Sequence, residues 1–237
     1  MIFHPPLQAA TLLCRYRRFL ADVRLEDGST LTVHTANTGA MTGCAEPGMG
    51  VLLSESDNPR RKYRHSWELS EIAPGTWVSV NTARANALVA EAVAAGVMTE
   101  LQGYDTLRRE VRFGMENSRV DLLLERGGRR CYVEVKNVTL AGRGIAAFPD
   151  AVSARGARHL RELMHTVTAG HRAVLCFCVA RGDVHAVRPA DDIDPRYGAT
   201  LRAAARAGVE VIAYRAAVSP REVRLAEALP VWLEGGY

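Results

Sequence analysis

The sequence predicts an α/β protein, α+β in overall organisation, with a small N-terminal β-barrel over residues 1–80 and an α/β domain with a mixed central sheet over residues 81–237. Two observations lead to this fold class. Short segments of alternating apolar and polar residues fill the first third of the chain, whereas strand and helix patterns alternate in the rest. A content of 48% hydrophobic and 24% charged residues is enough to bury a core at this length.

The composition also bounds the location and the partners. No segment approaches the roughly 20 consecutive apolar residues of a membrane-spanning helix. The first residues lack the charged start and apolar stretch of a signal peptide. Cysteines without a Cys-x-x-Cys spacing predict neither a disulfide framework nor a zinc ribbon. We therefore expect a cytoplasmic protein without a membrane partner, and the net charge of +4 gives a mild bias toward polyanions.

The first third of the chain has the pattern of an all-β module. Alternation predicts one strand over residues 15–25, a turn at Glu26-Asp27-Gly28, and further strands over residues 30–34, 51–54, 66–72 and 77–80. Roughly five short strands of this kind fit an OB-like β-barrel, whose face and loops commonly bind oligonucleotides. An SH3-like barrel fits nearly as well.

Positive charge concentrates in this module. The segment 58–65 interleaves cations with Tyr63 and precedes Trp67, a composition suited to phosphate contacts and base stacking. A solvated basic loop is the alternative. We expect nucleic-acid contacts from Arg15, Arg17, Arg18, Arg60, Arg61, Lys62 and Arg64.

A predicted hairpin over residues 117–139 is the centre of the second domain. The pair Gly127-Gly128 readily adopts the positive φ angles of a two-residue hairpin turn. With that turn, Leu122 faces Val133 and the pattern continues along one wholly apolar surface, which must be buried.

Two carboxylates lie on the opposite surface of this hairpin. The register places Asp121 directly across from Glu134, with Lys136 two residues further along the same face. Carboxylates about 4.5–5.5 Å apart repel each other unless a cation lies between them. Oxygen ligands suit Mg²⁺ or Mn²⁺, and a lysine can stabilise charge developing on a phosphate oxygen. A solvated salt-bridge ladder is the alternative, and we favour the metal site.

Asp, a turn, and Glu-x-Lys on the next strand resemble the PD-(D/E)xK nuclease-like superfamily. The resemblance implies a restriction-endonuclease-like domain in which Asp121 and Glu134 hold a metal and Lys136 is the catalytic lysine. In this superfamily a glutamate from the first helix often joins the metal. Glu91 in the helix predicted after residue 81 is the candidate here, and Glu100 is a second one.

The remaining elements follow from periodicity. A strand is predicted over residues 107–113, and residues 140–144 are a loop. Helical spacing predicts a helix that follows Phe148-Pro149-Asp150 and ends at Gly170. Arg155 and Arg158 lie near its positive end, where we expect phosphate contacts or, equally, a solvated basic face. His159 and His165 have no carboxylate or histidine partner at a recognisable spacing and receive no role. Further elements are strands over 172–180, 183–187 and 209–214 and a helix over 195–207.

Longer strings of residues are distinctive, among them Asn37-Thr-Gly-Ala-Met41, Asn58-Pro-Arg-Arg-Lys62, Cys131-Tyr-Val-Glu-Val-Lys-Asn-Val-Thr-Leu140, Phe148-Pro-Asp-Ala-Val152 and Arg155-Gly-Ala-Arg-His-Leu160. On these strings the chain resembles the sugar fermentation stimulation protein A family. The resemblance implies an OB-like domain joined to a nuclease-like domain, DNA binding, and a role in regulating sugar catabolism, maltose use in particular. RNA stays open as an alternative partner.

Two functions remain open at this point. One is a Mg²⁺- or Mn²⁺-dependent nuclease that cleaves phosphodiester bonds, and the other is a non-catalytic DNA-binding regulator. The facing carboxylates favour the nuclease, because they would repel DNA in a protein that only binds it. No helix-turn-helix pattern is present, so we expect binding with little sequence preference and a steep salt dependence.

Overall fold

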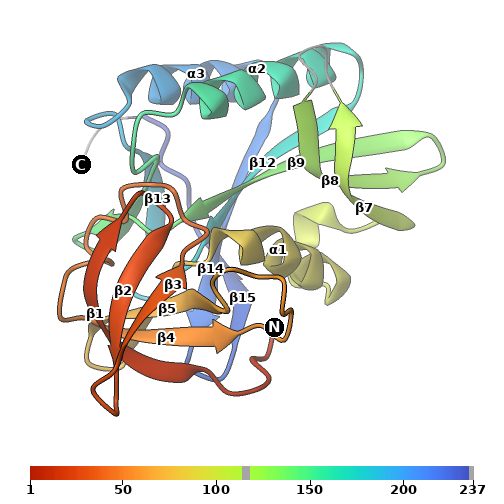
Figure 1. Ribbon diagram of the computed structural model, residues 1–237. Coiled ribbons are helices and arrows are strands. Elements are labelled where there is room, and N and C mark those ends of the chain that lie inside the picture. Colours follow the sequence, from red (N-terminus) through yellow and green to blue (C-terminus); the bar gives the residue numbers. More distant parts are fainter. Residues whose placement is uncertain (114–117, 235–237) are drawn as a thin grey trace.

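The computed structural model describes residues 1–113 and 118–234, which fold into a β-barrel beside a sheet covered by helices on both faces (Figure 1). The first residue of the predicted hairpin, Asn117, lies outside the described residues. No helix of the described part is long and apolar enough to cross a membrane.

The predicted N-terminal barrel is present and is of the OB type. Its strands follow the order β3-β2-β1-β4-β5-β6, and pairing between β3 and β5 closes the barrel. Its core includes the fully buried Leu12, Val23, Leu53 and Trp67. The bounds are β1 (Gln8–Tyr16), β2 (Leu20–Leu25), β3 (Thr30–His34), β4 (Gly50–Glu55), β5 (His65–Ala73) and β6 (Thr76–Ser79).

The single strand predicted over residues 15–25 is wrong. Residues 17–19 form a turn between β1 and β2, with Arg17 and Arg18 at φ angles of 49° and 64°. Glycine and asparagine usually occupy such left-handed positions in a hairpin turn. Two arginines in their place continue the alternation of apolar and polar residues, so the local sequence does not indicate the turn.

The predicted mixed sheet of the second domain is also present. Its order is β15-β14-β12-β9-β8-β7, with β9, β12 and β14 parallel and the three other strands antiparallel to their neighbours. The central strand β12 is buried along nearly its whole length, as its apolar run predicts. The bounds are β7 (Thr106–Phe113), β8 (Ser118–Arg126), β9 (Arg129–Val138), β12 (Arg172–Val179), β14 (Glu210–Val218) and β15 (Val223–Ala228).

The edge strand β15 was not predicted, because the expected pattern ended at residue 214. It pairs with β14 and also receives the start of the chain: Val223 donates its N–H to the carbonyl of Met1 at 3.0 Å, and Phe3 donates to Arg221 at 2.9 Å. The first three residues therefore lie against the second domain, and the barrel strands begin after them.

Helices cover the two faces of this sheet (Figure 1). Helix α1 (Ala85–Ala94), preceded by the short 3₁₀ turn η1 (Thr82–Arg84) that Asn81 caps, packs on one face. Helices α2 (Ala154–Thr168) and α3 (Pro195–Arg206) pack on the other face. Ser153 and Asp194 cap these two helices by accepting backbone N–H groups of their first turns.

A small separate sheet, β10-β11-β13, lies beside the central one. It corrects two expectations. The predicted loop at residues 140–144 contains the strand β10 (Ala141–Gly142), which pairs with β11 (Ile145–Phe148). The strand expected at 183–187 is β13 (Ala186–Pro189), which pairs with β11 and not with the central sheet.

Candidate active site

The predicted glycine turn and register of the β8–β9 hairpin are observed up to one point. Pairing runs from Arg126 with Arg129 to Leu122 with Val133, the last pair among the described residues. The expected ladder pair of Asp121 with Glu134 is not formed. Asp121 instead turns its carboxylate to the backbone of β9, where Oδ2 accepts the N–H of Val135 at 2.7 Å. The carboxylate takes a donor that a continued ladder would use, and β8 leaves β9 there.

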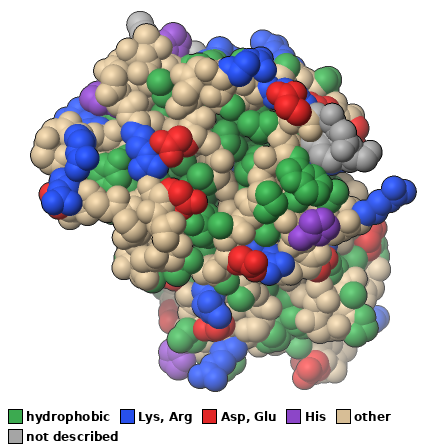
Figure 2. Space-filling view, turned by 180° about the vertical axis from the view of Figure 1, so that it is seen from behind, with side chains coloured by type: hydrophobic (Ala, Val, Ile, Leu, Met, Phe, Trp, Pro, Cys, Tyr) green, Lys and Arg blue, Asp and Glu red, His purple; other side chains and the backbone are tan. Residues whose placement is uncertain are grey.

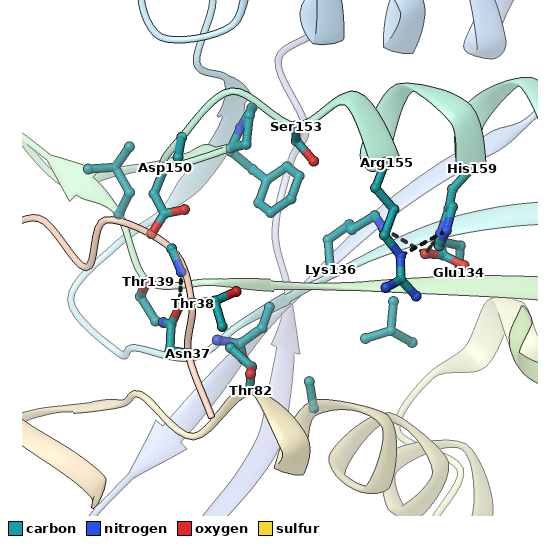
Figure 3. Close-up of a pocket in the computed structure, with 18 of the residues that line it drawn as sticks. Asn37, Thr38, Thr82, Glu134, Lys136, Thr139, Asp150, Ser153, Arg155 and His159 are labelled. Carbon is teal, nitrogen blue, oxygen red and sulfur yellow. Dashed lines mark hydrogen bonds and ion pairs between the residues drawn. The ribbon is translucent and has the colours of Figure 1, made fainter. Parts of the chain in front are cut away.

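The two carboxylates nevertheless belong to one site, which Lys136 and a residue of α2 complete. Glu134 is only 2% exposed. Its Oε1 accepts the Lys136 ammonium at 2.6 Å and contacts Nδ1 of His159 (Figure 3). Its Oε2 is buried and has no hydrogen-bond partner among the described residues. A buried carboxylate oxygen without a partner is costly in a folded protein, so this oxygen is a candidate ligand atom for a cation.

The electrostatics of the pair are asymmetric. Burial, and then the nearby Glu134 carboxylate, raise the pKa of Asp121 to about 6, although the N–H of Val135 and the Asn86 amide favour its anion. Burial also opposes ionisation of Glu134, but Lys136 and His159 together outweigh burial and lower its pKa. As the pH rises Glu134 therefore ionises first, and Asp121 keeps its proton to a higher pH.

These residues open into a cavity of about 600 Å³ between the two domains. The α/β domain contributes the site residues, the loop before α2, and Arg155. The barrel contributes Arg18 and the loop at residues 37–39. In Figure 3, Asn37 and Thr38 lie on one side of the cavity, and Glu134, Lys136, Arg155 and His159 lie on the other.

The structure does not bring Glu91 or Glu100 to this cavity. Glu91 is on α1, but its carboxylate pairs with the amine of Met1 at 2.8 Å, and Glu100 accepts the hydroxyl of Tyr214 at 2.5 Å. The residue of α1 that reaches the site is Asn86, whose amide donates to Asp121 at 2.9 Å. Glu91 lies about one and a half turns further along α1 than Asn86 and is directed away from Asp121.

Some basic residues of the barrel are exposed, and others use their side chains in hydrogen bonds within the barrel. Arg15 is not a free phosphate contact, because its guanidinium donates to the carbonyls of Arg18, Asn37 and Gly39 at 2.6–2.9 Å. Arg17 and Arg18 are exposed at the β1–β2 turn. Arg61 donates to Ser66 at 3.0 Å.

The rest of the basic segment forms the loop between β4 and β5. Arg60 and Lys62 are exposed, and Lys62 lies 5.3 Å from the centre of the Tyr63 ring. Arg64 pairs with Glu55 at 2.9 Å. Trp67, expected to stack on bases, is fully buried in the barrel core and donates its indole N–H to Leu69. Its side chain is therefore unavailable for stacking.

The two arginines of α2 also differ. Arg155 lines the cavity, and its Nε donates to Nε2 of His159 at 3.3 Å. Arg158 lies one turn along the helix, is half-buried, and is not among the described residues that line the cavity.

Three residues of the site were missed from the sequence. His159 lies 25 residues from Glu134, and only the packing of α2 on the sheet brings them together. Asp150 accepts the backbone N–H of Met41, 109 residues away, at 3.1 Å. Asn86 is uncharged and belongs to no motif that indicates a functional role. The segments that contain Asp150 and His159 indicated a family resemblance but no role for either residue.

The fold and the site define a two-domain architecture: an OB barrel joined to a restriction-endonuclease-like domain, with an acidic cluster at the junction. The family model "SfsA N-terminal OB domain" matches residues 13–80, and the model "Sugar fermentation stimulation protein RE domain" matches residues 83–222. The chain belongs to the sugar fermentation stimulation protein family.

Individual relatives match over the full length. The sugar fermentation stimulation protein homolog of Thioalkalivibrio sulfidiphilus is 59% identical over 232 residues, covering 98% of both chains. The homolog of Geobacter sulfurreducens is 57% identical over 231 residues, again covering 98% of both. Among solved structures, SfsA of Pyrococcus furiosus in complex with Ca²⁺ has a TM-score of 0.90 at 27% identity, covering 98% of both chains.

Proposed function

We propose that this protein is a divalent-metal-dependent nuclease that binds DNA with little sequence preference and hydrolyses phosphodiester bonds. One observation carries the proposal. Glu134 is 2% exposed and keeps one carboxylate oxygen without a partner among the described residues, beside Asp121 and Lys136, at the wall of a cavity that both domains line. A protein that only bound nucleic acid would gain nothing from buried anions at that position.

The residues present fit a divalent cation. Asp121 and the unpartnered oxygen of Glu134 offer the carboxylate oxygens that Mg²⁺ and Mn²⁺ prefer. Burial, and then Glu134, raise the pKa of Asp121, and a bound cation would oppose both effects by stabilising the Asp121 anion. The complex of Pyrococcus furiosus SfsA with Ca²⁺ is consistent with this ligand chemistry. When bound, such a metal polarises a phosphoryl oxygen and lowers the pKa of its water.

The chain's own residues supply the other roles. Lys136 holds its ammonium against Glu134 and lines the cavity, where it can stabilise the charge that develops on a phosphate oxygen. Arg18 and Arg155 line the same cavity from opposite domains and attract the phosphate backbone. His159 fixes the orientation of the Glu134 carboxylate through Oε1.

DNA binding is assigned to the loops of the barrel. The turn at residues 17–19 and the basic loop at residues 56–64 occupy the connections β1–β2 and β4–β5 of the OB barrel. These are the OB loops that commonly contact oligonucleotides, and RNA offers them the same phosphates. On the face of the molecule that Figure 2 shows, Lys and Arg are interspersed with Asp and Glu, so the described residues of that face offer no comparable basic patch.

A cleavage assay with matched variants tests the proposal. Labelled single-stranded, duplex and branched DNA, and RNA, would be incubated with Mg²⁺ or Mn²⁺. We expect products from wild type, and a loss of at least about 100-fold in rate for Glu134→Gln and for Lys136→Met. Glu91→Gln is the control, because it removes a carboxylate of the same domain that pairs with Met1 outside the cavity.

Metal binding has a readout of its own. Calorimetric titration with Mn²⁺ should detect a site in wild type and in Glu91→Gln, and should lose it in Glu134→Gln. Cleavage that survives in Glu134→Gln would refute the assignment of the site. Binding to all substrates without cleavage or metal uptake would leave the second function, a DNA-binding regulator that acts without catalysis.

A further inference from the structure

A loop of the barrel closes one side of the cavity and links the barrel to the α/β domain. Residues 36–41 form this bridging loop, which follows β3. Thr82, at the start of the second domain, donates its hydroxyl to the carbonyl of Ala36 at 3.0 Å. At the other end of the loop, Asp150 accepts the N–H of Met41 at 3.1 Å. The loop is therefore attached to the α/β domain at both of its ends.

The middle of the bridging loop is equally constrained. Arg15 donates to the carbonyls of Asn37 and Gly39 at 2.9 Å, and the Asn37 side chain accepts the N–H of Gly39 at 2.9 Å. Gly39 also approaches the second domain so closely that a Cβ placed there would collide with the carboxylate of Asp150. Only glycine allows this contact, so the loop and the segment before α2 close on each other.

The closed bridge limits what can reach the acidic residues. Glu134 lines the cavity but is 2% exposed, and its Oε2, which has no partner among the described residues, is fully buried. The cavity volume of about 600 Å³ lies in the range of about 300–1,000 Å³ that encloses single small ligands. It therefore accommodates a phosphate with its flanking nucleotides from one strand. A base-paired duplex would bring its second strand against the bridging loop and α2.

We infer that this site accepts a single nucleic-acid strand, or nucleotides unpaired from a duplex, and that the bridging loop excludes intact duplex. The inference rests on the proposed function for the cleavage step, and strand entry can be tested separately. Enzymes with enclosed sites reach nucleotides in a duplex only after these are unpaired. Arg18 and Arg155, on opposite sides of the cavity, are placed to hold the phosphates of the entering strand.

Photo-crosslinking measures entry without requiring cleavage. The probes are a single-stranded oligonucleotide carrying 4-thiothymidine, its 4-thiouridine RNA counterpart, and a 4-thiothymidine duplex of the same sequence with both ends closed by non-nucleotide linkers. The reactions contain Ca²⁺, and crosslinked peptides are identified by mass spectrometry. We expect at least tenfold more crosslinking to residues 36–41 and 148–155 with a single strand than with the closed duplex. Equal crosslinking of the duplex, or no crosslinking of either single strand to these segments, would overturn the inference.

Variants of the bridge test its part in the selection. Asp150→Ala removes the acceptor for Met41, and Gly39→Ala forces the loop away from Asp150. Both should reduce the preference for the single strand at least threefold. Gly142→Ala is the matched control, because a Cβ there meets no atom within 4 Å. Circular dichroism confirms that each variant is folded, and an unchanged preference in folded Asp150→Ala and Gly39→Ala would refute the role of the loop.

Failure of the inference and failure of the proposed function give different results. If single strands crosslink to the cavity but nothing is cut with Mg²⁺ or Mn²⁺, the inference stands and the nuclease proposal fails. If the closed duplex is cut as fast as the single strand and the products depend on Glu134, the nuclease stands and the inference fails.

Discussion

Replacing Asp121 by asparagine should stabilise the metal-free protein at neutral and alkaline pH. In the folded state the pKa of Asp121 is raised to about 6 from an ordinary value of 3.8, chiefly by burial and then by Glu134. A raised pKa means that the folded state binds the proton more tightly than the unfolded state. The wild-type protein therefore loses stability as the pH rises from about 4 to 6, and the full loss persists above that window.

The size of the effect follows from the same shift. A difference of about 2 pKa units corresponds to about 3 kcal/mol at pH 8. About half of that cost is already present at pH 5, where the unfolded carboxyl is ionised and the folded one is mostly not. Solvent reaches this partly buried group, and asparagine has one acceptor oxygen where Asp121 uses two, so it loses the hydrogen bond from either Val135 or Asn86. We therefore expect Asp121→Asn to gain about 1–2 kcal/mol at pH 8, and about 1 kcal/mol less at pH 5.

Urea unfolding in EDTA at several pH values between 5 and 8 measures this difference. Wild type in saturating Mg²⁺ or Mn²⁺ provides the counterpart, because a cation held by the carboxylates should stabilise wild type and leave Asp121→Asn nearly unchanged. A variant that is less stable than wild type at pH 8 in EDTA, or a difference that stays constant with pH, would refute the electrostatic reasoning.

Three further predictions separate structural residues from nucleic-acid contacts. Arg15→Ala should lower the free energy of unfolding by about 1–3 kcal/mol, because it leaves the carbonyls of the bridging loop without their donor, and thermal unfolding checks this. Arg60→Ala should leave stability unchanged but reduce the slope of log K against log salt for DNA binding by about 1, measured by fluorescence anisotropy; an unchanged slope would exclude Arg60 from the interface. Trp67→Phe should cost about 1–3 kcal/mol through its lost bond to Leu69, without changing the DNA affinity of the folded protein.

Local patterns predicted most of the fold. The Gly127-Gly128 turn fixed the hairpin register as far as Leu122, and the unbroken apolar run of β12 indicated a strand buried on both faces. Both signals act over a few residues, so they are visible in sequence. The turn at Arg17 and Arg18 has no such local signal. Two arginines and not glycine adopt its left-handed backbone, so no short pattern predicts it.

The site was predicted only where it is local. Asp121, Glu134 and Lys136 are close in the hairpin, and their spacing alone brought them together. His159 and Asp150 reach the cavity through the packing of α2 and of the two domains, which no short-range pattern records. Glu91 is the opposite case. Its charge suggested a metal ligand, but it pairs with Met1, and the helix orients the uncharged Asn86 toward Asp121.

The arrangement around Glu134 explains how a buried carboxylate can stay ionised and still have a free oxygen. The Nε–H of Arg155 can only donate, so Nε2 of His159 is an acceptor and its proton lies on Nδ1, which faces Glu134. Lys136 donates to the same oxygen, Oε1. Two donors on one oxygen hold the carboxylate in place and favour its charge, while Oε2 has no partner among the described residues. The helix α2 therefore does more than cover the sheet, because through Arg155 and His159 it fixes which oxygen of Glu134 is left for the proposed cation.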